Sequence, residues 1–107
     1  MQNKGGLLLM LSVLWLGVGS AVQAQEIKAV QLYTQDELIN MINRNEHLNR
    51  VVMDRCQLNQ DIEARAEVLK VPAYQFLWGD MLAWGVCVEA EPERGVDFMR
   101  QAADQGL

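Results

Sequence analysis

The side chains best equipped for chemistry are two cysteines, Cys56 and Cys87, and one histidine, His47. Thiols and imidazoles serve as nucleophiles, general bases and zinc ligands. A structural zinc site takes four such ligands, whereas this chain has no CxxC motif and no second histidine. The sequence therefore predicts no metal site, no catalytic residue and no cofactor. His47 follows a polar run and has no cluster of acidic or thiol groups beside it, and we expect it to face solvent or cap a helix.

The first 24 residues have the pattern of a secretory signal peptide. Lys4 precedes an uncharged apolar run from Leu7 to Val18, and the small residues that follow end at Ala24. The run of about twelve residues is shorter than the roughly twenty that span a bilayer. We expect cleavage after Ala24 and no membrane span afterwards; the alternative is an uncleaved anchor.

Both cysteines lie in the part of the chain that would be exported. An oxidising compartment favours a disulfide between Cys56 and Cys87 over two free thiols, which is the alternative. In the chain-entropy model, such a bond stabilises the fold by roughly 3 to 4 kcal/mol.

Outside the signal peptide the chain carries fourteen acidic and eight basic side chains. This acidic balance argues against partners that are nucleic acids or anionic membrane surfaces.

Residues 25–70 are predicted to form an N-terminal helical region. Thr34 and Glu37 make a capping box, which predicts a helix over Gln35–Asn43. A second helix is indicated by apolar residues at helical spacing. These are Leu58, Ile62, Ala66 and Leu69.

Residues 71–107 are predicted to form a helical hairpin. Pro72 and Pro92 each begin a helix, and Gly85 and Gly106 end them in turn. Gly79 is expected to remove a side chain where the two helices cross. The apolar stripe of the first helix is Ala73, Leu77, Met81 and Trp84, and the inner face of the second is Gly95, Phe98 or Met99, and Ala102. Trp78 and Trp84 are expected to fill the hairpin.

This hairpin resembles the Sel1-like repeat family, a relative of the tetratricopeptide repeat. The matching positions are Gly79, Gly85, Val88, Ala102, Ala103 and Gly106. Cys87 stands where the family usually has a loop glycine. The resemblance implies an all-α fold built of helical hairpins, as in an α-solenoid.

Longer stretches, LYTQDELINMINRNEHLNRV and DRCQLNQDIEARAEVLKVPAYQFLWGDMLAWGVCV, resemble the N-terminal part of a family of periplasmic proteins of the sodium-driven polar flagellar motor. The resemblance implies a non-enzymatic scaffold at the flagellar basal body, in a ring with a MotY-like protein, that supports stator subunits. It implies no small-molecule substrate. The chain stops where a further repeat would begin, so we expect a truncated reading frame or a partner that covers Val96, Met99 and Ala103.

Partner contacts are expected in the N-terminal helical region, at Leu38, Ile42, Leu48 and Val52. In the alternative, these four residues pack back onto the hairpin. Two other functions stay open. One is a generic exported Sel1-like adaptor for another envelope protein. The other is an enzyme, since cysteine-rich Sel1-like proteins bind or hydrolyse β-lactams, but this chain lacks the Ser-x-x-Lys motif that supplies a nucleophile.

Overall fold

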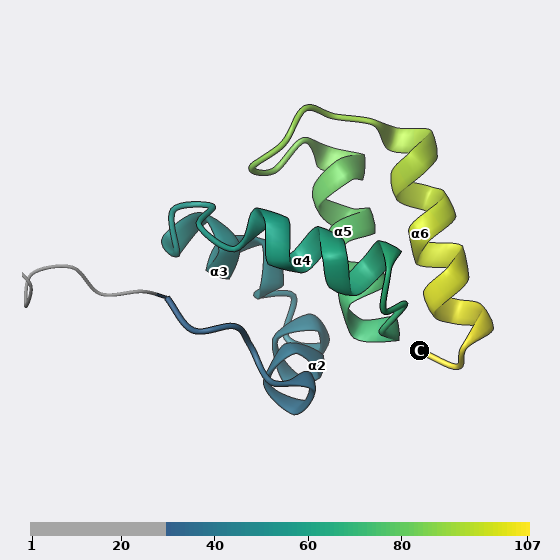
Figure 1. Ribbon diagram of the computed structural model, residues 1–107, viewed down its shortest axis with the longest axis horizontal. Coiled ribbons are helices and arrows are strands. Elements are labelled where there is room, and N and C mark those ends of the chain that lie inside the picture. Colours follow the sequence, from purple (N-terminus) through teal and green to yellow (C-terminus); the bar gives the residue numbers. More distant parts are fainter. Residues whose placement is uncertain (1–29) are drawn as a thin grey trace, which may run out of the picture.

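The computed structural model describes residues 30–107, and the predicted signal peptide over 1–24 lies outside this range. Helices are the only regular elements of the described part, which confirms the all-α prediction (Figure 1). Their bounds are α2 Gln35–Asn43, α3 His47–Met53, α4 Asn59–Glu67, α5 Pro72–Trp84 and α6 Pro92–Asp104. Within 30–107, none of the helices combines the length and the apolar character needed to cross a membrane.

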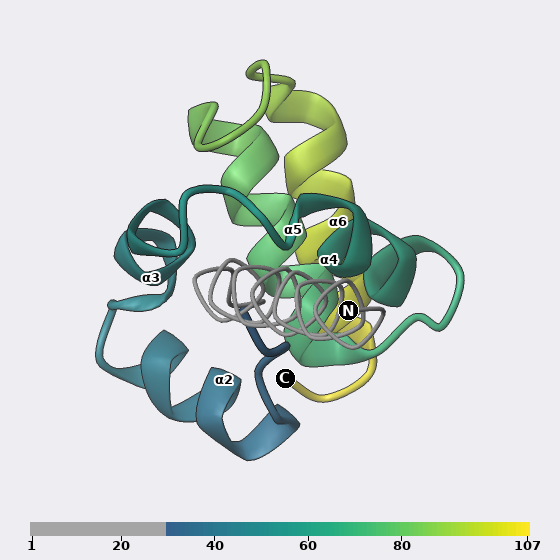
Figure 2. The same ribbon diagram turned by 60° about the vertical axis from the view of Figure 1, so that its left-hand side comes forward.

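Helix α5 is the central element and contacts each of the other described helices (Figures 1 and 2). Its sequence, PAYQFLWGDMLAW, is apolar around most of its circumference, as expected of a helix buried on several sides. The helix contributes eight buried residues to the core: Ala73, Tyr74, Gln75, Leu77, Trp78, Gly79, Met81 and Leu82. These residues lie on different faces of α5, which contact α2 and α3 on one side and α4 and α6 on others.

Helices α5 and α6 approach closely because glycines face each other where they cross. A Cβ atom on Gly79 would lie 2.6 Å from the carbonyl oxygen of Gly95, and a Cβ on Gly95 would collide with the carbonyl oxygen of Gly79. The predicted role of Gly79 is therefore seen, and Gly95 has the same role on the opposite helix.

The predicted helix boundaries follow local signals. Both halves of the Thr34–Glu37 capping box form, and α2 has the predicted bounds. Pro72 and Pro92 lie in the first turns of α5 and α6. Gly85 ends α5 with φ 72°, the left-handed conformation expected of a C-terminal glycine.

Three details differ from the sequence-based expectation. Helix α3 was not predicted, because it is only seven residues long, too short to show the apolar spacing that indicated α4, and Glu46 before it makes no side-chain cap. Helix α4 ends at Glu67, and a left-handed Lys70 (φ 55°) redirects the chain before Pro72, which leaves Leu69 exposed. Trp84 has 75% of its surface exposed, so Trp78 alone of the two tryptophans packs into the core.

A disulfide between Cys56 and Cys87 joins the turn after α3 to the loop between α5 and α6. Both cysteines have positive φ, 59° and 64°, a region where a side chain costs about 1 kcal/mol or more and glycine is favoured. The backbone at Cys87 is thus left-handed, the conformation in which glycine is the favoured residue. The bond ties the N-terminal helices to the hairpin.

Candidate partner-binding groove

The four residues predicted to contact a partner have different environments. Leu38 is fully buried in the core, as in the alternative in which these residues pack inward. Ile42 and Leu48 are partly buried against that core. Val52, on α3, has 54% of its surface exposed. The structure thus separates residues that a partner can reach from one that it cannot.

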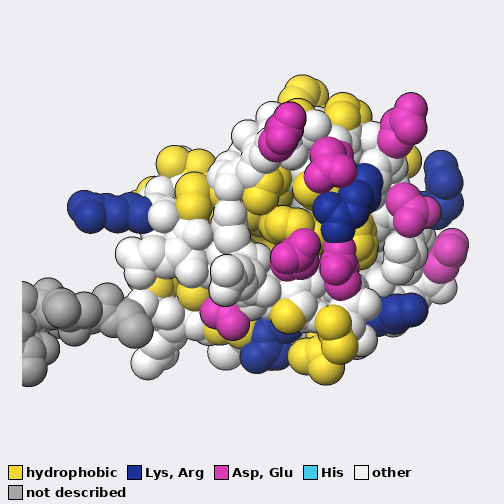
Figure 3. Space-filling model, turned by 45° about the horizontal axis from the view of Figure 1, so that its top comes forward, with side chains coloured by type: hydrophobic (Ala, Val, Ile, Leu, Met, Phe, Trp, Pro, Cys, Tyr) yellow, Lys and Arg dark blue, Asp and Glu magenta, His cyan; other side chains and the backbone are white. Residues whose placement is uncertain are grey.

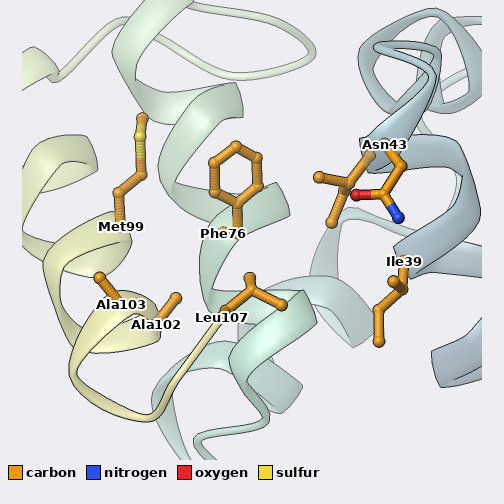
Figure 4. Close-up of a pocket in the computed structure, with 8 residues that line it drawn as sticks. Ile39, Asn43, Phe76, Met99, Ala102, Ala103 and Leu107 are labelled. Carbon is orange, nitrogen blue, oxygen red and sulfur yellow. The ribbon is translucent and has the colours of Figure 1, made fainter.

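Ile42 lies in an apolar groove between α2 and the hairpin, with a volume of about 270 Å³. We call this the α2–α6 groove. Its lining residues are Ile39, Ile42 and Asn43 of α2, Phe76 of α5, Met99, Ala102 and Ala103 of α6, and Leu107. Figure 4 shows Ile39 and Asn43 on one side, Met99 and Ala103 on the other, and Phe76 between them.

The groove follows from how each segment is positioned. The capping box and the buried Leu38 fix α2 against α5, and this leaves Ile39 and Ile42 beside the buried face. The Gly79–Gly95 crossing brings α6 close to α5. The small residues Ala102 and Ala103 then leave space above Phe76.

The lining of the groove is suited to binding. Its side chains are apolar apart from one amide, that of Asn43, and none of these side chains titrates. Such a surface buries apolar side chains of a partner and orients them through one hydrogen-bonding group. No three His, Cys, Asp or Glu side chains within residues 30–107 are placed to hold a metal ion.

His47 supports the floor of the groove, which corrects the expectation that it faces solvent. Only 3% of its surface is exposed, and its Nε2 atom lies 2.6 Å from a carboxylate oxygen of Asp80. Its ring centroid is 5.5 Å from that of Phe76. The signal was missed because Asp80 lies 33 residues away on α5, so the partner of His47 appears only in the folded chain.

The chain entering α2 is held by two tyrosines. The Tyr33 hydroxyl donates to Asp54 at 2.5 Å, and the Tyr74 hydroxyl donates to the Tyr33 carbonyl oxygen at 2.6 Å. Burial, followed by the hydrogen bond to Asp54, raises the pKa of Tyr33 well above its ordinary value. Burial also raises the pKa of Tyr74.

The six positions shared with the Sel1-like family are divided between packing and the surface. Gly79 and Ala102 are buried, whereas Ala103 and Gly106 are exposed. Val88 packs on the core from the loop after Gly85. Among these, Ala102 and Ala103 reach the groove; the family assignment itself remains a prediction.

One characterised protein is closely similar to this chain. Over 78 residues, the chain is 58% identical to the sodium-type polar flagellar protein MotX of Vibrio parahaemolyticus serotype O3:K6 (strain RIMD 2210633). The match covers 73% of this chain and 37% of the relative, so the chain spans little more than a third of the relative's length. No family model and no solved structure matches the chain. The likeness to the N-terminal region of a polar flagellar motor protein, predicted from the sequence, is therefore confirmed as a partial match.

Proposed function

We propose that this protein is a non-enzymatic periplasmic scaffold of the polar flagellar motor. In this proposal it joins a ring around the basal body with a MotY-like protein and supports stator assembly and rotation. The observation that carries the proposal is the 58% identity to MotX over 78 residues. Identity at this level over most of the described chain reflects common descent. We therefore expect the two proteins to share their partner-binding surfaces.

The structure supports a binding role in two ways. The α2–α6 groove is lined by apolar side chains and one amide, which suits a docking surface. The disulfide between Cys56 and Cys87 suits a chain that works in an oxidising compartment such as the periplasm.

We further propose that the MotY-like protein docks in the α2–α6 groove. A groove between two helices accepts apolar side chains from a helix or loop of a partner, and Phe76 supplies an aromatic floor. Ile42, predicted from sequence, and Met99, on the opposite wall, are then the main contact residues.

The function is tested by deleting the gene in its host and complementing with this chain. We expect cells without the gene to keep their flagella, seen by staining, but to lose swimming in soft agar, because motor torque and not filament assembly is affected. Complementation by a signal-peptide deletion (residues 25–107) should fail even when the protein accumulates, which tests the need for export.

Normal swimming of the deletion strain would contradict the motor role. It would favour the second candidate function, a generic exported adaptor that binds another envelope protein. A deletion strain without filaments would also contradict the proposal, because it would place the defect in flagellar assembly instead of rotation.

A further inference from the structure

A second depression lies on the face where α4, α5 and α6 meet, separate from the α2–α6 groove. We call it the acidic hollow; its volume is about 410 Å³. Its lining residues are Asn59, Gln60, Glu63, Trp78, Leu82, Val88, Glu89, Glu91 and Arg94. Figure 3 shows this face, with hydrophobic side chains in a central depression and acidic side chains around a basic one beside it.

The rim of the acidic hollow has an excess of negative charge. Three carboxylates line it, from Glu63, Glu89 and Glu91, against one guanidinium, that of Arg94. Arg94 is already paired with Glu67, which lies outside the lining, and its guanidinium stacks over Phe98 at 5.5 Å. It therefore does not neutralise the rim in full.

The rim carboxylates also retain access to an incoming group. Arg94 is 3.8 Å from a carboxylate oxygen of Glu63 and 3.5 Å from one of Glu91. The side chains of these two glutamates are 42% and 53% exposed. Both can accept further hydrogen bonds from a cation that enters the hollow, since an ionised carboxylate has about four acceptor positions.

Two lining residues of the hollow contain buried polar atoms without partners. Trp78 is only 4% exposed, and its indole Nε1 makes no hydrogen bond. The Asn59 amide nitrogen donates to the Cys87 carbonyl oxygen at 2.7 Å, but its Oδ1 atom is buried without a partner. Both atoms expose less than 1 Å² of surface, so they lie beneath the wall of the hollow, and the floor that a ligand meets is the apolar surface of Trp78, Leu82 and Val88.

We propose that the acidic hollow binds a basic segment of a partner protein. The cationic side chain of the segment pairs with carboxylate oxygens of Glu63, Glu89 and Glu91 that Arg94 leaves free, and its aliphatic stem packs on Leu82 and Val88. This inference rests on the negative rim and the apolar floor of the hollow and is independent of the flagellar assignment.

Two other classes of ligand fit less well. An anion would meet the net negative rim and is disfavoured by it. A metal ion would need at least three suitable side chains together, and no such group is present within residues 30–107. A cationic side chain with an aliphatic stem matches both the negative rim and the apolar floor of the hollow.

The proposal is tested by two-dimensional NMR of the ¹⁵N-labelled, oxidised protein. The probe is the capped tripeptide acetyl-Gly-Arg-Gly-amide, and the matched control is the same peptide with citrulline, which has nearly the same shape and no charge. We expect the arginine peptide to shift the indole N–H signal of Trp78 in a saturable manner. The indole signal of Trp84, which is exposed on the end of α5, should stay in place.

Charge variants assign the binding to the rim. Glu63→Gln combined with Glu91→Gln should weaken binding of the arginine peptide about fivefold, because two of the three rim carboxylates that attract the arginine lose their charge. Glu46→Gln combined with Asp104→Asn removes equal charge outside the hollow and should change the affinity by less than about twofold.

Three results would overturn the proposal: no shift of the Trp78 indole, an equal shift with the citrulline peptide, or equal weakening by the two charge-matched double variants. None of these bears on swimming, so failure here is distinguishable from failure of the proposed motor function.

Discussion

Gly79 and Gly95 show how single residues set the geometry of this protein. Each glycine has the backbone of the other helix where its own side chain would be, so no flexible side chain can move aside. We predict that Gly79→Ala lowers the free energy of unfolding by about 1 to 3 kcal/mol, the range for an overpacked core. Urea unfolding followed by circular dichroism measures this. Arg100→Ala, on the exposed side of α6, is the control and should change stability by less than about 0.5 kcal/mol; equal effects of the two changes would contradict the close crossing.

The raised pKa of Tyr33 makes the stability of the folded protein depend on pH in the alkaline range. This pKa is raised in the folded protein by burial and by the hydrogen bond to Asp54. An unfolded tyrosine loses its proton near pH 10, so above about that pH the unfolded state binds fewer protons than the folded state and the free energy of unfolding falls as pH rises. Below this range the contribution is fully present and does not change with pH.

The measurement is urea unfolding at several pH values between 8 and 11. Tyr33→Phe should flatten the decline above pH 10, because phenylalanine does not titrate. Tyr74 also has a raised pKa, so Tyr74→Phe should flatten it in part and the double variant more than either. A decline of the same slope in the double variant would assign the alkaline loss to other groups.

At the scale of elements, the disulfide links the N-terminal helices covalently to the hairpin. It closes a loop with a sequence separation of 31, for which the chain-entropy model gives roughly 3 to 4 kcal/mol. We predict a loss of this size in the variant Cys56→Ser/Cys87→Ser, measured by urea unfolding. The wild type with reducing agent should behave like the variant, and the variant itself should not respond to the reducing agent.

A second variant separates the bond from the backbone at Cys87. Because Cys87 has φ 64°, Cys56→Ser/Cys87→Gly should be more stable than the double serine variant by about 1 kcal/mol. If glycine gave no advantage over serine, the left-handed backbone at position 87 would not persist without the bond.

The elements that sequence reasoning predicted are those with local signals. Helix α2 has a capping box, and α5 and α6 each begin with a proline, so their bounds depend on neighbouring residues alone. Helix α3 lacks such a signal and is held by tertiary burial of His47 and Val51. Trp84 has the spacing of the buried stripe but lies in the last turn of α5, where no other element covers it.

The groove was harder to predict than the helices. Ile42 was identified from the pattern of α2, but Phe76 and Met99 belong to other helices. Their meeting depends on how α2 packs against α5, which is a property of the tertiary fold. The acidic hollow was missed for the same reason, since its lining comes from α4, α5, α6 and a loop.

At the scale of the whole molecule, two surfaces are candidates for partner binding: the α2–α6 groove and the exposed side of α3. Ile42 lies in the α2–α6 groove, whereas Val52 is exposed on α3, and both were predicted partner contacts. We predict that Ile42→Asp weakens capture of the MotY-like protein at least about tenfold, or about 1.4 kcal/mol, because a carboxylate must lose its hydration on entering an apolar interface.

Val52→Asp is the matched control, since it introduces the same charge on an exposed residue of a neighbouring helix. It should alter the affinity by less than about twofold, and both variants should keep the circular dichroism spectrum of the wild type. Calorimetric titration with the purified partner gives the two affinities. If Val52→Asp weakened capture as much as Ile42→Asp, α3 would share the interface; if neither did, the groove would not be the docking surface. A selective effect of Ile42→Asp, with swimming reduced in the same variant, would connect the groove to the motor, because the affinity and the motility would then depend on one side chain.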